Sequence, residues 1–138
     1  MVMNGDSFCR VDFIDFIDFH FKRKAFVSMV ISEKKNNTDY GTVLLNYSLQ
    51  IKKFSKEKIK KNKNFTNTGI YLFQKEILSF IPSERFFSLE NDLFPDFDCK
   101  KFYGFITKEF YVDIGTPESY ESAKVFLKKI GSSNEKKV

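Results

Sequence analysis

The order of apolar and polar positions along the chain predicts that strands and helices are mixed throughout. Short runs rich in β-branched and aromatic residues are typical of strands. On this basis we expect strands at residues 1–3, 26–31, 42–45, 49–54, 65–73, 102–107 and 110–114. The first of these should be the end of a buried strand. Two hairpins are expected, one joining 42–45 to 49–54 and one joining 102–107 to 110–114 over Lys108 and Glu109.

Helical spacing of apolar residues appears in other stretches. Residues 11–24 carry apolar or aromatic side chains at positions 13, 14, 16, 17, 20 and 21, which predicts a helix with a broad inner face. Shorter helices are expected at 74–80 and at 88–97, where Ser88 is a good N-cap and Pro95 limits the length.

The last helix has the clearest boundaries. Thr116 suits the N-cap, Pro117 the first helical position, and Gly131 the end of the helix. Its apolar face should be formed by Tyr120, Ala123, Phe126, Leu127 and Ile130. These elements predict one α/β domain with a mixed sheet over residues 1–130 and a flexible polar tail at 131–138.

Composition narrows the class of protein. The chain has 138 residues, enough for one core, and no apolar run approaches the roughly 20 residues that a membrane span needs. No signal peptide is visible, and Cys9 and Cys99 are isolated, so we expect reduced thiols, a cytoplasmic location and no membrane partner. His20 lies in an apolar stretch and is expected to be a core or helix-face residue, not a metal ligand or a base.

The positive charge is concentrated in one segment. The net charge is +5, and the crowded residues are Lys52, Lys53, Lys56, Lys58, Lys60, Lys61 and Lys63. A solvated loop is the favoured interpretation. A phosphate-facing patch is the functional alternative. Nucleic-acid binding is the least favoured, because the nearby Phe54 and Phe65 do not alternate with lysines as a base-stacking surface would.

Two aspartates occupy similar positions. Asp6 follows the apolar run at the start, and Asp113 ends a strand before Gly115 turns the chain into a helix. Ligands of open α/β sheets bind outside the carboxyl ends of strands, and two carboxylates there could share a divalent cation with substrate phosphates. The spacing alone favours a plainer interpretation, in which Asn4-Gly5-Asp6 is an ordinary turn and Asp113 caps a neighbouring element.

The motifs VMNGDSF, YGTVLL, NTGIYLF, FSLENDLFP and YGFITKEFYVDIGTPESYESA occur in this order. Over residues 1–130 they resemble the sugar-1-phosphate nucleotidyltransferase family, most of all its D-glycero-D-manno-heptose 1-phosphate and mannose-1-phosphate guanylyltransferases. The resemblance implies a Rossmann-like nucleotide-diphospho-sugar transferase fold. It also implies that a sugar 1-phosphate and a nucleoside triphosphate (NTP) give an NDP-sugar and pyrophosphate with Mg²⁺. A product of the GDP-heptose or GDP-mannose type would serve polysaccharide biosynthesis.

The resemblance also implies roles for individual residues. Asp6 and Asp113 match the two aspartates that carry the catalytic metal. Residues matching those that contact the sugar or its phosphate are Gly41, Glu57, Lys58, Asn67 and Gly69. Thr68 departs from the smaller residue that is common at its position, and the segment with Glu57 and Lys58 carries one extra residue.

One family motif has no match in this chain. The family has a glycine-rich loop of the type G-G-x-G-T-R-L for the triphosphate, whereas the glycines here stand apart at 5, 41, 69, 104, 115 and 131. We therefore expect the C-terminal, sugar-binding part of the domain, with the N-terminal part missing and little transferase activity by itself. The alternatives are a non-catalytic sugar-phosphate binding or interaction domain, or a subunit completed by a separate N-terminal polypeptide. A homo-oligomer also stays open.

Overall fold

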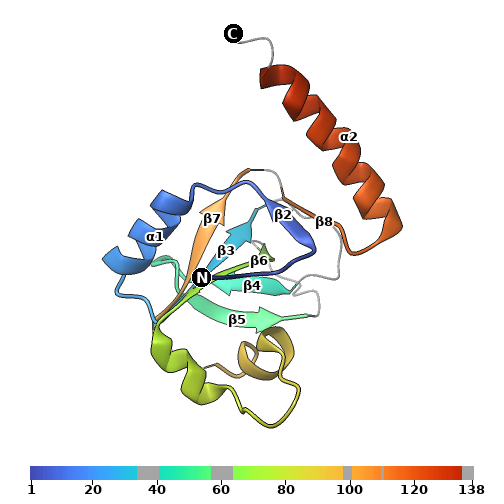
Figure 1. Ribbon diagram of the computed structural model, residues 1–138. Helices are drawn as coiled ribbons and strands as arrows, with labels where there is room; N and C mark the ends of the chain where they lie inside the picture. Colours follow the sequence, from blue (N-terminus) through green and yellow to red (C-terminus); the bar gives the residue numbers. More distant parts are fainter. Residues whose placement is uncertain (34–40, 57–63, 98–100, 110, 135–138) are drawn as a thin grey trace.

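The computed structural model describes residues 1–33, 41–56, 64–97, 101–109 and 111–134 (Figure 1). The strands are β1 (Val2–Met3), β2 (Ser7–Cys9), β3 (Val27–Ser32), β4 (Thr42–Leu45), β5 (Ile51–Ser55), β6 (Phe65–Phe73), β7 (Phe102–Thr107) and β8 (Tyr111–Asp113). The helical elements are α1 (Phe13–Lys22), the 3₁₀-helix η1 (Lys75–Phe80), the π-helical turn η2 (Leu89–Leu93) and α2 (Pro117–Asn134).

The larger sheet has the strand order β5-β4-β6-β3-β7, and β1 pairs with β6 beside this path. Strand β3 runs parallel to β7 and antiparallel to β6, so the predicted mixed sheet is confirmed. The predicted hairpin of β4 and β5 is also confirmed. Figure 1 shows α1 on one face of this sheet and η2 on the other.

The second predicted hairpin is wrong. Strand β7 pairs with β3 in parallel, and β8 pairs with β2 in a separate two-stranded sheet. The reason lies in the bend after β7. The Thr107 hydroxyl accepts a hydrogen bond from the Glu109 N–H over 3.1 Å and donates one to the Arg10 carbonyl oxygen over 3.3 Å. These bonds direct the chain out of the larger sheet and towards the segment that contains β2.

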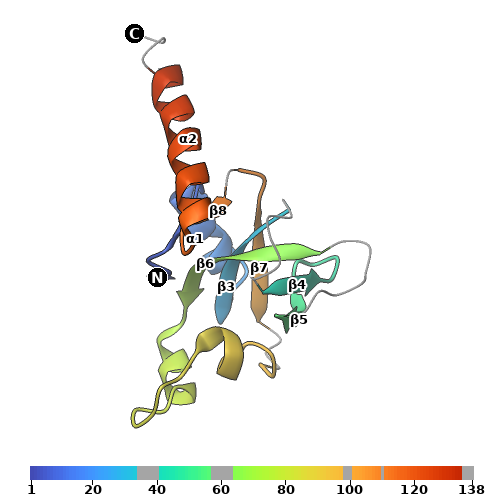
Figure 2. The same ribbon diagram turned by 90° about the vertical axis from the view of Figure 1, so that its right-hand side faces the viewer.

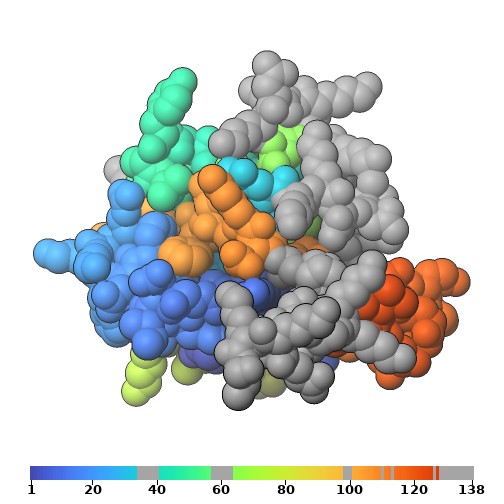
Figure 3. Space-filling view, turned by 90° about the horizontal axis from the view of Figure 1, so that it is seen from above, coloured from blue at the N-terminus to red at the C-terminus, as the bar shows by residue number. Residues whose placement is uncertain are grey.

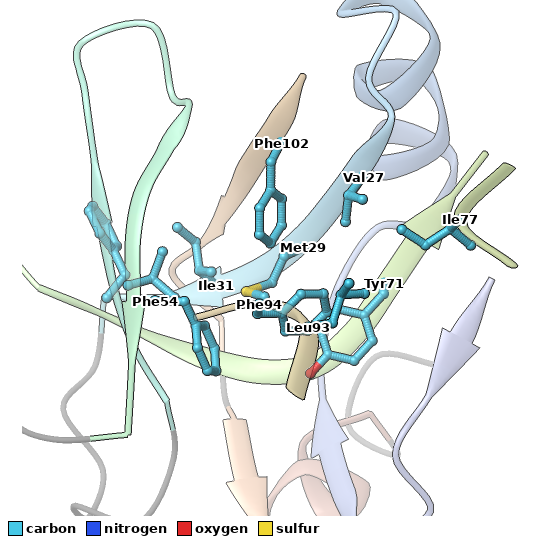
Figure 4. Close-up of a cluster of buried hydrophobic side chains, with 11 residues drawn as sticks. Val27, Met29, Ile31, Phe54, Tyr71, Ile77, Leu93, Phe94 and Phe102 are labelled. Carbon is cyan, nitrogen blue, oxygen red and sulfur yellow. The ribbon is translucent and has the colours of Figure 1, made fainter. Parts of the chain in front are cut away.

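Strand β3 is the centre of the core, because all its residues are fully buried. Alternation along a strand sends successive side chains to opposite faces. Val27, Met29 and Ile31 pack with Phe94 in the cluster on the η2 face (Figure 4). Val30 packs instead with Phe16 of α1. Removing one such phenylalanine side chain from water contributes roughly 1.5–3 kcal/mol, so both faces of β3 stabilise the fold.

Helix α1 is confirmed, but its predicted broad inner face is wrong. Phe16 and His20 are buried, whereas Ile14 and Phe21 are 76% and 71% exposed. A helix that packs against one face of a sheet buries only a stripe of its surface, and positions outside this stripe stay exposed. The carboxylate of Asp12 caps the helix by accepting the N–H groups of residues 14 and 15.

The segment predicted as a helix at 88–97 is shorter than expected. Its helical part is η2, and the Ser88 hydroxyl accepts the Asn91 N–H over 3.2 Å, as an N-cap should. The Asp92 carboxylate accepts the Ser88 N–H over 2.7 Å. The shorter helix predicted at 74–80 is confirmed as η1, although its hydrogen bonding is of the 3₁₀ type.

Helix α2 begins as predicted, since Thr116 Oγ1 accepts the Ser119 N–H over 3.2 Å and Pro117 is the first helical residue. Its predicted end is wrong, because Gly131 lies inside the helix. Figures 1 and 2 show α2 extending away from the sheets. This explains why Tyr120 is exposed and only Ala123 of the predicted apolar face is found buried. The side chains of Phe126 and Ile130 lie outside the described ones.

Strand β1 corrects another expectation. It pairs with β6, with Val2 opposite Tyr71, but it is an edge strand in the part of the chain that the structure describes. Val2 and Met3 are 43% and 47% exposed, so the predicted burial of this strand is wrong. No helix among the described residues is long and apolar enough to cross a membrane.

Candidate functional site

The turn that carries Asp6 lies against the strand that carries Asp113. Strands β2 and β8 pair antiparallel, with Ser7 opposite Asp113. One position further, the Ile114 N–H donates to the Asp6 carbonyl oxygen over 2.7 Å. The fold therefore makes neighbours of the two aspartate backbones, an adjacency that the sequence left open.

The N-terminus of helix α2 follows Asp113, one member of this pair, closely along the chain. Asp6 is exposed, and its turn precedes β2 directly. On the other side, α2 begins four residues after Asp113 (Pro117). The first N–H groups of a helix and its dipole favour a negative group near the N-terminus.

Seen from above (Figure 3), the ends of β3 and β7, cyan and orange, lie side by side, in agreement with the pairing of Ser32 and Thr107.

The Asp6 turn is also tied to β6, where the register with β3 shifts between Asn67 and Tyr71. Gly69 lies in this irregular stretch with φ +74°, a left-handed conformation that favours glycine. Its carbonyl oxygen accepts the Asn4 N–H over 2.9 Å. A Cβ at Gly69 would lie 2.6 Å from Asn4 Nδ2, so the close approach of the two segments also disfavours a side chain at this position.

Gly41 is joined to the same stretch. Its carbonyl oxygen accepts the Asn67 N–H over 2.9 Å. Gly41 is buried, and a Cβ at this position would overlap the ring of Phe54. The structure thus joins three of the predicted site residues, Gly41, Asn67 and Gly69, to Asn4 through a series of hydrogen bonds, and Asp6 follows Asn4 two residues along the chain.

The Asn67 side chain is buried in a polar network that sequence reasoning missed. Its Nδ2 donates to Tyr71 Oη over 2.7 Å and to Glu90 Oε1 over 2.8 Å, and its Oδ1 accepts the Gly69 N–H over 3.0 Å. Tyr71 Oη donates to the same Glu90 oxygen over 2.8 Å. Burial, with the negative charge of Glu90 as the next cause, raises the pKa of Tyr71, so its hydroxyl stays a donor. In the sequence, Glu90 indicated only an acid in the first turn of a helix.

The structure explains why position 68 holds a threonine and not the smaller residue that is common there. Its side chain is fully buried, and its hydroxyl donates to the Val30 carbonyl oxygen over 2.9 Å. A buried hydroxyl needs such a partner, and β3 supplies it. The residue therefore belongs to the packing behind the site.

Two predicted site residues, Glu57 and Lys58, lie outside the described residues. Of the lysine run, Lys52, Lys53 and Lys56 are exposed, in agreement with the solvated interpretation. The remaining lysines of the run also lie outside the described part of the chain.

The metal prediction rests on the aspartate pair. Among the described side chains, no group of three or more His, Cys, Asp or Glu residues is arranged to hold a metal ion. Mg²⁺ is commonly bound by one or two carboxylates together with substrate phosphates, so a larger cluster is not required. The exposed carboxylate of Asp6 fits this chemistry, and its role as a ligand with Asp113 stays a prediction.

Cys9 and His20 belong to the packing, as expected. Cys9 is a half-buried free thiol, and burial raises its pKa to about 11. His20 is buried, and its Nδ1 lies 2.8 Å from the Ser28 hydroxyl oxygen. Burial lowers the pKa of His20. Cys99 lies outside the described residues.

The mixed sheet with helices defines an α/β domain, and comparison with known proteins identifies its family. The family model described as Nucleotidyl transferase matches residues 1–130, so the chain belongs to the nucleotidyl transferase family. This confirms the resemblance that its motifs indicated. That the chain is the sugar-binding, C-terminal part of the domain stays a prediction.

Several guanylyltransferases are similar to the chain. The D-glycero-alpha-D-manno-heptose 1-phosphate guanylyltransferase of Aneurinibacillus thermoaerophilus is 34% identical over 125 residues, which are 90% of this chain and 54% of that protein. The mannose-1-phosphate guanylyltransferase of Mycobacterium tuberculosis is 29% identical, over 87% of this chain and 34% of that protein. The chain thus spans at most about half the length of these curated relatives.

Solved structures agree with the fold. HddC from Yersinia pseudotuberculosis matches with a TM-score of 0.71 and 29% identity, over 88% of this chain and 52% of that one. A putative glucose-1-phosphate thymidylyltransferase from Bacillus anthracis matches with a TM-score of 0.72 at 17% identity, which supports the fold alone. The predicted nucleotidyltransferase fold is therefore confirmed.

Proposed function

We propose that this chain forms the sugar-1-phosphate and metal-binding side of a nucleotidyltransferase site of the guanylyltransferase type. The observation that carries the proposal is the β2–β8 pairing, which places the backbones of Asp6 and Asp113 beside each other in a member of this family. Its relatives include guanylyltransferases for heptose 1-phosphate and mannose 1-phosphate. We propose a sugar 1-phosphate of this type as the substrate, polysaccharide biosynthesis as the use of the product, and the cytoplasm as the location.

In this reaction a phosphate oxygen of the sugar 1-phosphate attacks the α-phosphorus of the NTP. The bond between that phosphorus and the oxygen bridging to the β-phosphate breaks, and pyrophosphate leaves. Bound Mg²⁺ would supply charge neutralisation for the phosphates. The chain's own contribution would be positioning, with Asp6 and Asp113 holding the ion and the hydrogen-bonded backbone of Gly41, Asn67 and Gly69 orienting the sugar.

The triphosphate needs further residues. A loop of closely spaced glycines would hold it with backbone N–H groups, and the glycines of this chain are scattered. We therefore propose that the triphosphate-binding loop comes from residues outside these 138. With this 138-residue chain alone, we expect no pyrophosphate release from GTP and mannose 1-phosphate.

The test is a titration of the ¹⁵N-labelled chain with mannose 1-phosphate in the presence of Mg²⁺, followed by amide chemical shifts. We expect saturable shifts at Gly69 and in the Asp6 turn. Replacing Mg²⁺ by Mn²⁺ should broaden the signals of residues near Asp6 and Asp113. Asp6→Asn should weaken the Mn²⁺ affinity about tenfold, and Asp18→Asn, which removes an exposed carboxylate from α1, should leave it unchanged.

Three results would each contradict one part of the proposal. Absence of saturable binding of mannose 1-phosphate or heptose 1-phosphate would remove the substrate assignment. Equal Mn²⁺ affinity of the wild type and Asp6→Asn would remove the metal assignment. Pyrophosphate release by the 138-residue chain alone would show that it contains its own triphosphate site.

A second function is favoured by β1. Val2 and Met3 form an exposed apolar edge next to β6, and exposed edges of this kind pair with other strands. We propose as the alternative that the chain is a sugar-phosphate binding subunit whose site is completed by another polypeptide at this edge. A monomeric chain that unfolds cooperatively and gains no activity with a triphosphate-binding partner would remove this alternative.

A further inference from the structure

A half-buried carboxylate lies behind the candidate site and has no role in the chemistry proposed above. Glu90 of η2 accepts two hydrogen bonds at one oxygen, from Tyr71 Oη over 2.8 Å and from Asn67 Nδ2 over 2.8 Å. Both donors are on β6 and are almost fully buried. An acceptor that serves two buried donors is costly to remove, because both donors would lose their partner.

The network determines which way the Asn67 amide points. With Nδ2 held by Tyr71 and Glu90, the amide oxygen is directed to the Gly69 N–H, 3.0 Å away. If the amide turned over, the Gly69 N–H would face an NH₂ group and the Glu90 carboxylate would face an oxygen. The Glu90 carboxylate therefore selects the orientation that supports the left-handed bend at Gly69.

The bend in turn holds the turn that carries Asp6. The Gly69 carbonyl oxygen accepts the Asn4 N–H over 2.9 Å, and Asp6 is two residues further along the chain. A continuous path of hydrogen bonds and short backbone links therefore runs from Glu90 through Asn67 and Gly69 to the Asp6 turn.

We propose that Glu90, together with Tyr71, is a positioning residue: by fixing the Asn67 amide it sets the Gly69 bend and, through it, the place of the Asp6 turn. In this role the Asn67 side chain positions other parts of the protein, because both hydrogens of its NH₂ group are already donated to Tyr71 and Glu90. The inference rests on the proposed function in one respect: the Asp6 turn, which Glu90 positions, belongs to the candidate metal and sugar-phosphate site.

The experiment compares Glu90→Ala and Glu90→Gln with Asp96→Ala in the full chain. Asp96 is an exposed acid shortly after η2, so it controls for loss of a charge in this segment. The first measurement needs no ligand: the backbone amide shifts of Gly69 and Asp6 and the side-chain NH₂ shifts of Asn67. Glu90→Ala should move all three sets, Glu90→Gln should move them less because its amide oxygen still accepts, and Asp96→Ala should leave them in place.

The second measurement is the affinity for mannose 1-phosphate with Mg²⁺. Glu90→Ala should weaken it about tenfold, equivalent to about 1.4 kcal/mol, and Glu90→Gln should restore most of the loss. If Glu90→Ala proves unfolded, the same amide signals are followed in Tyr71→Phe and Glu90→Gln instead. Unchanged Gly69 and Asp6 shifts in folded variants would overturn the inference. Lack of wild-type binding would overturn the proposed function, while the shift measurement would still test the network.

Discussion

Replacing Gly69 by alanine introduces two separate costs at the bend of β6. The residue has φ +74°, and the left-handed region costs an alanine about 1–2 kcal/mol. Part of this is offset, because alanine reduces the conformational entropy of the unfolded chain by about 0.4–1 kcal/mol. The backbone part should therefore amount to roughly 1 kcal/mol of lost stability.

The second cost is steric. A Cβ on residue 69 would lie 2.6 Å from Asn4 Nδ2, 2.7 Å from Asn4 Cγ and 2.9 Å from Asn4 Cβ. Overpacking costs typically about 1–3 kcal/mol, and the lower end applies here because Asn4 is exposed and can move. Gly69→Ala should thus destabilise the chain by about 2 kcal/mol in total.

The two costs can be separated by a double-mutant cycle. Asn4→Gly removes all three atoms that a Cβ would approach, so Gly69→Ala in this background should keep only the backbone cost, about 1 kcal/mol. The assay is urea unfolding of the wild type, both single variants and the double variant, followed by circular dichroism. The cost of Gly69→Ala should fall by about 1 kcal/mol when Asn4 is replaced. Equal costs in the two backgrounds would refute the close approach of these segments, and a negligible cost in both would refute the left-handed bend.

Two further predictions follow from buried titratable groups. Burial lowers the pKa of His20, so below the ordinary pKa of about 6.5 the unfolded chain takes up a proton that the folded chain resists. The wild type should therefore lose stability as the pH falls from 6.5 towards the lowered pKa. The His20→Asn variant should lose less stability over the same pH interval. Urea unfolding at pH 7.5, 6.5 and 5.5 measures both losses, and equal losses in the two proteins would contradict the burial argument. Because the Cys9 pKa is raised to about 11, its thiolate at pH 8 should be about a hundredfold scarcer than in the unfolded chain. Alkylation of Cys9 by iodoacetamide, followed by mass spectrometry, should be slower in the native chain by a similar order, and equal rates in urea and buffer would count against this.

The parts of the fold that the sequence predicted well are those decided by local patterns. Residues 65–73 and 102–107 have the predicted bounds as β6 and β7, because apolar and β-branched side chains fill both runs. The start of α2 follows from its capping residues. The errors come from tertiary contacts. The side chain of Thr107 directs the chain out of the larger sheet, and the exposed positions of α1 follow from how little of its surface reaches the sheet.

The candidate site, too, could be predicted only where local motifs mark its residues. Asp6, Gly41, Asn67 and Gly69 stand in short motifs, so they could be singled out from the sequence. The structure links the last three by hydrogen bonds that continue to Asn4, two residues before Asp6. The network with Glu90 has no periodic signature. Tyr71 and Asn67 reach the same carboxylate across an irregular stretch of β6, and Glu90 comes from a distant part of the chain, so no local rule gives that geometry.

The glycines of the site show why a motif alone leaves their role undecided. A glycine that approaches a sugar and a glycine that approaches another part of the protein look the same in a sequence. Here a Cβ at Gly41 would overlap the Phe54 ring, and a Cβ at Gly69 would meet Asn4. Both positions therefore require glycine before any ligand is bound. Loss of function on replacing either one would be uninformative about sugar contact unless stability is measured alongside binding, and the Asn4→Gly background supplies that separation for Gly69.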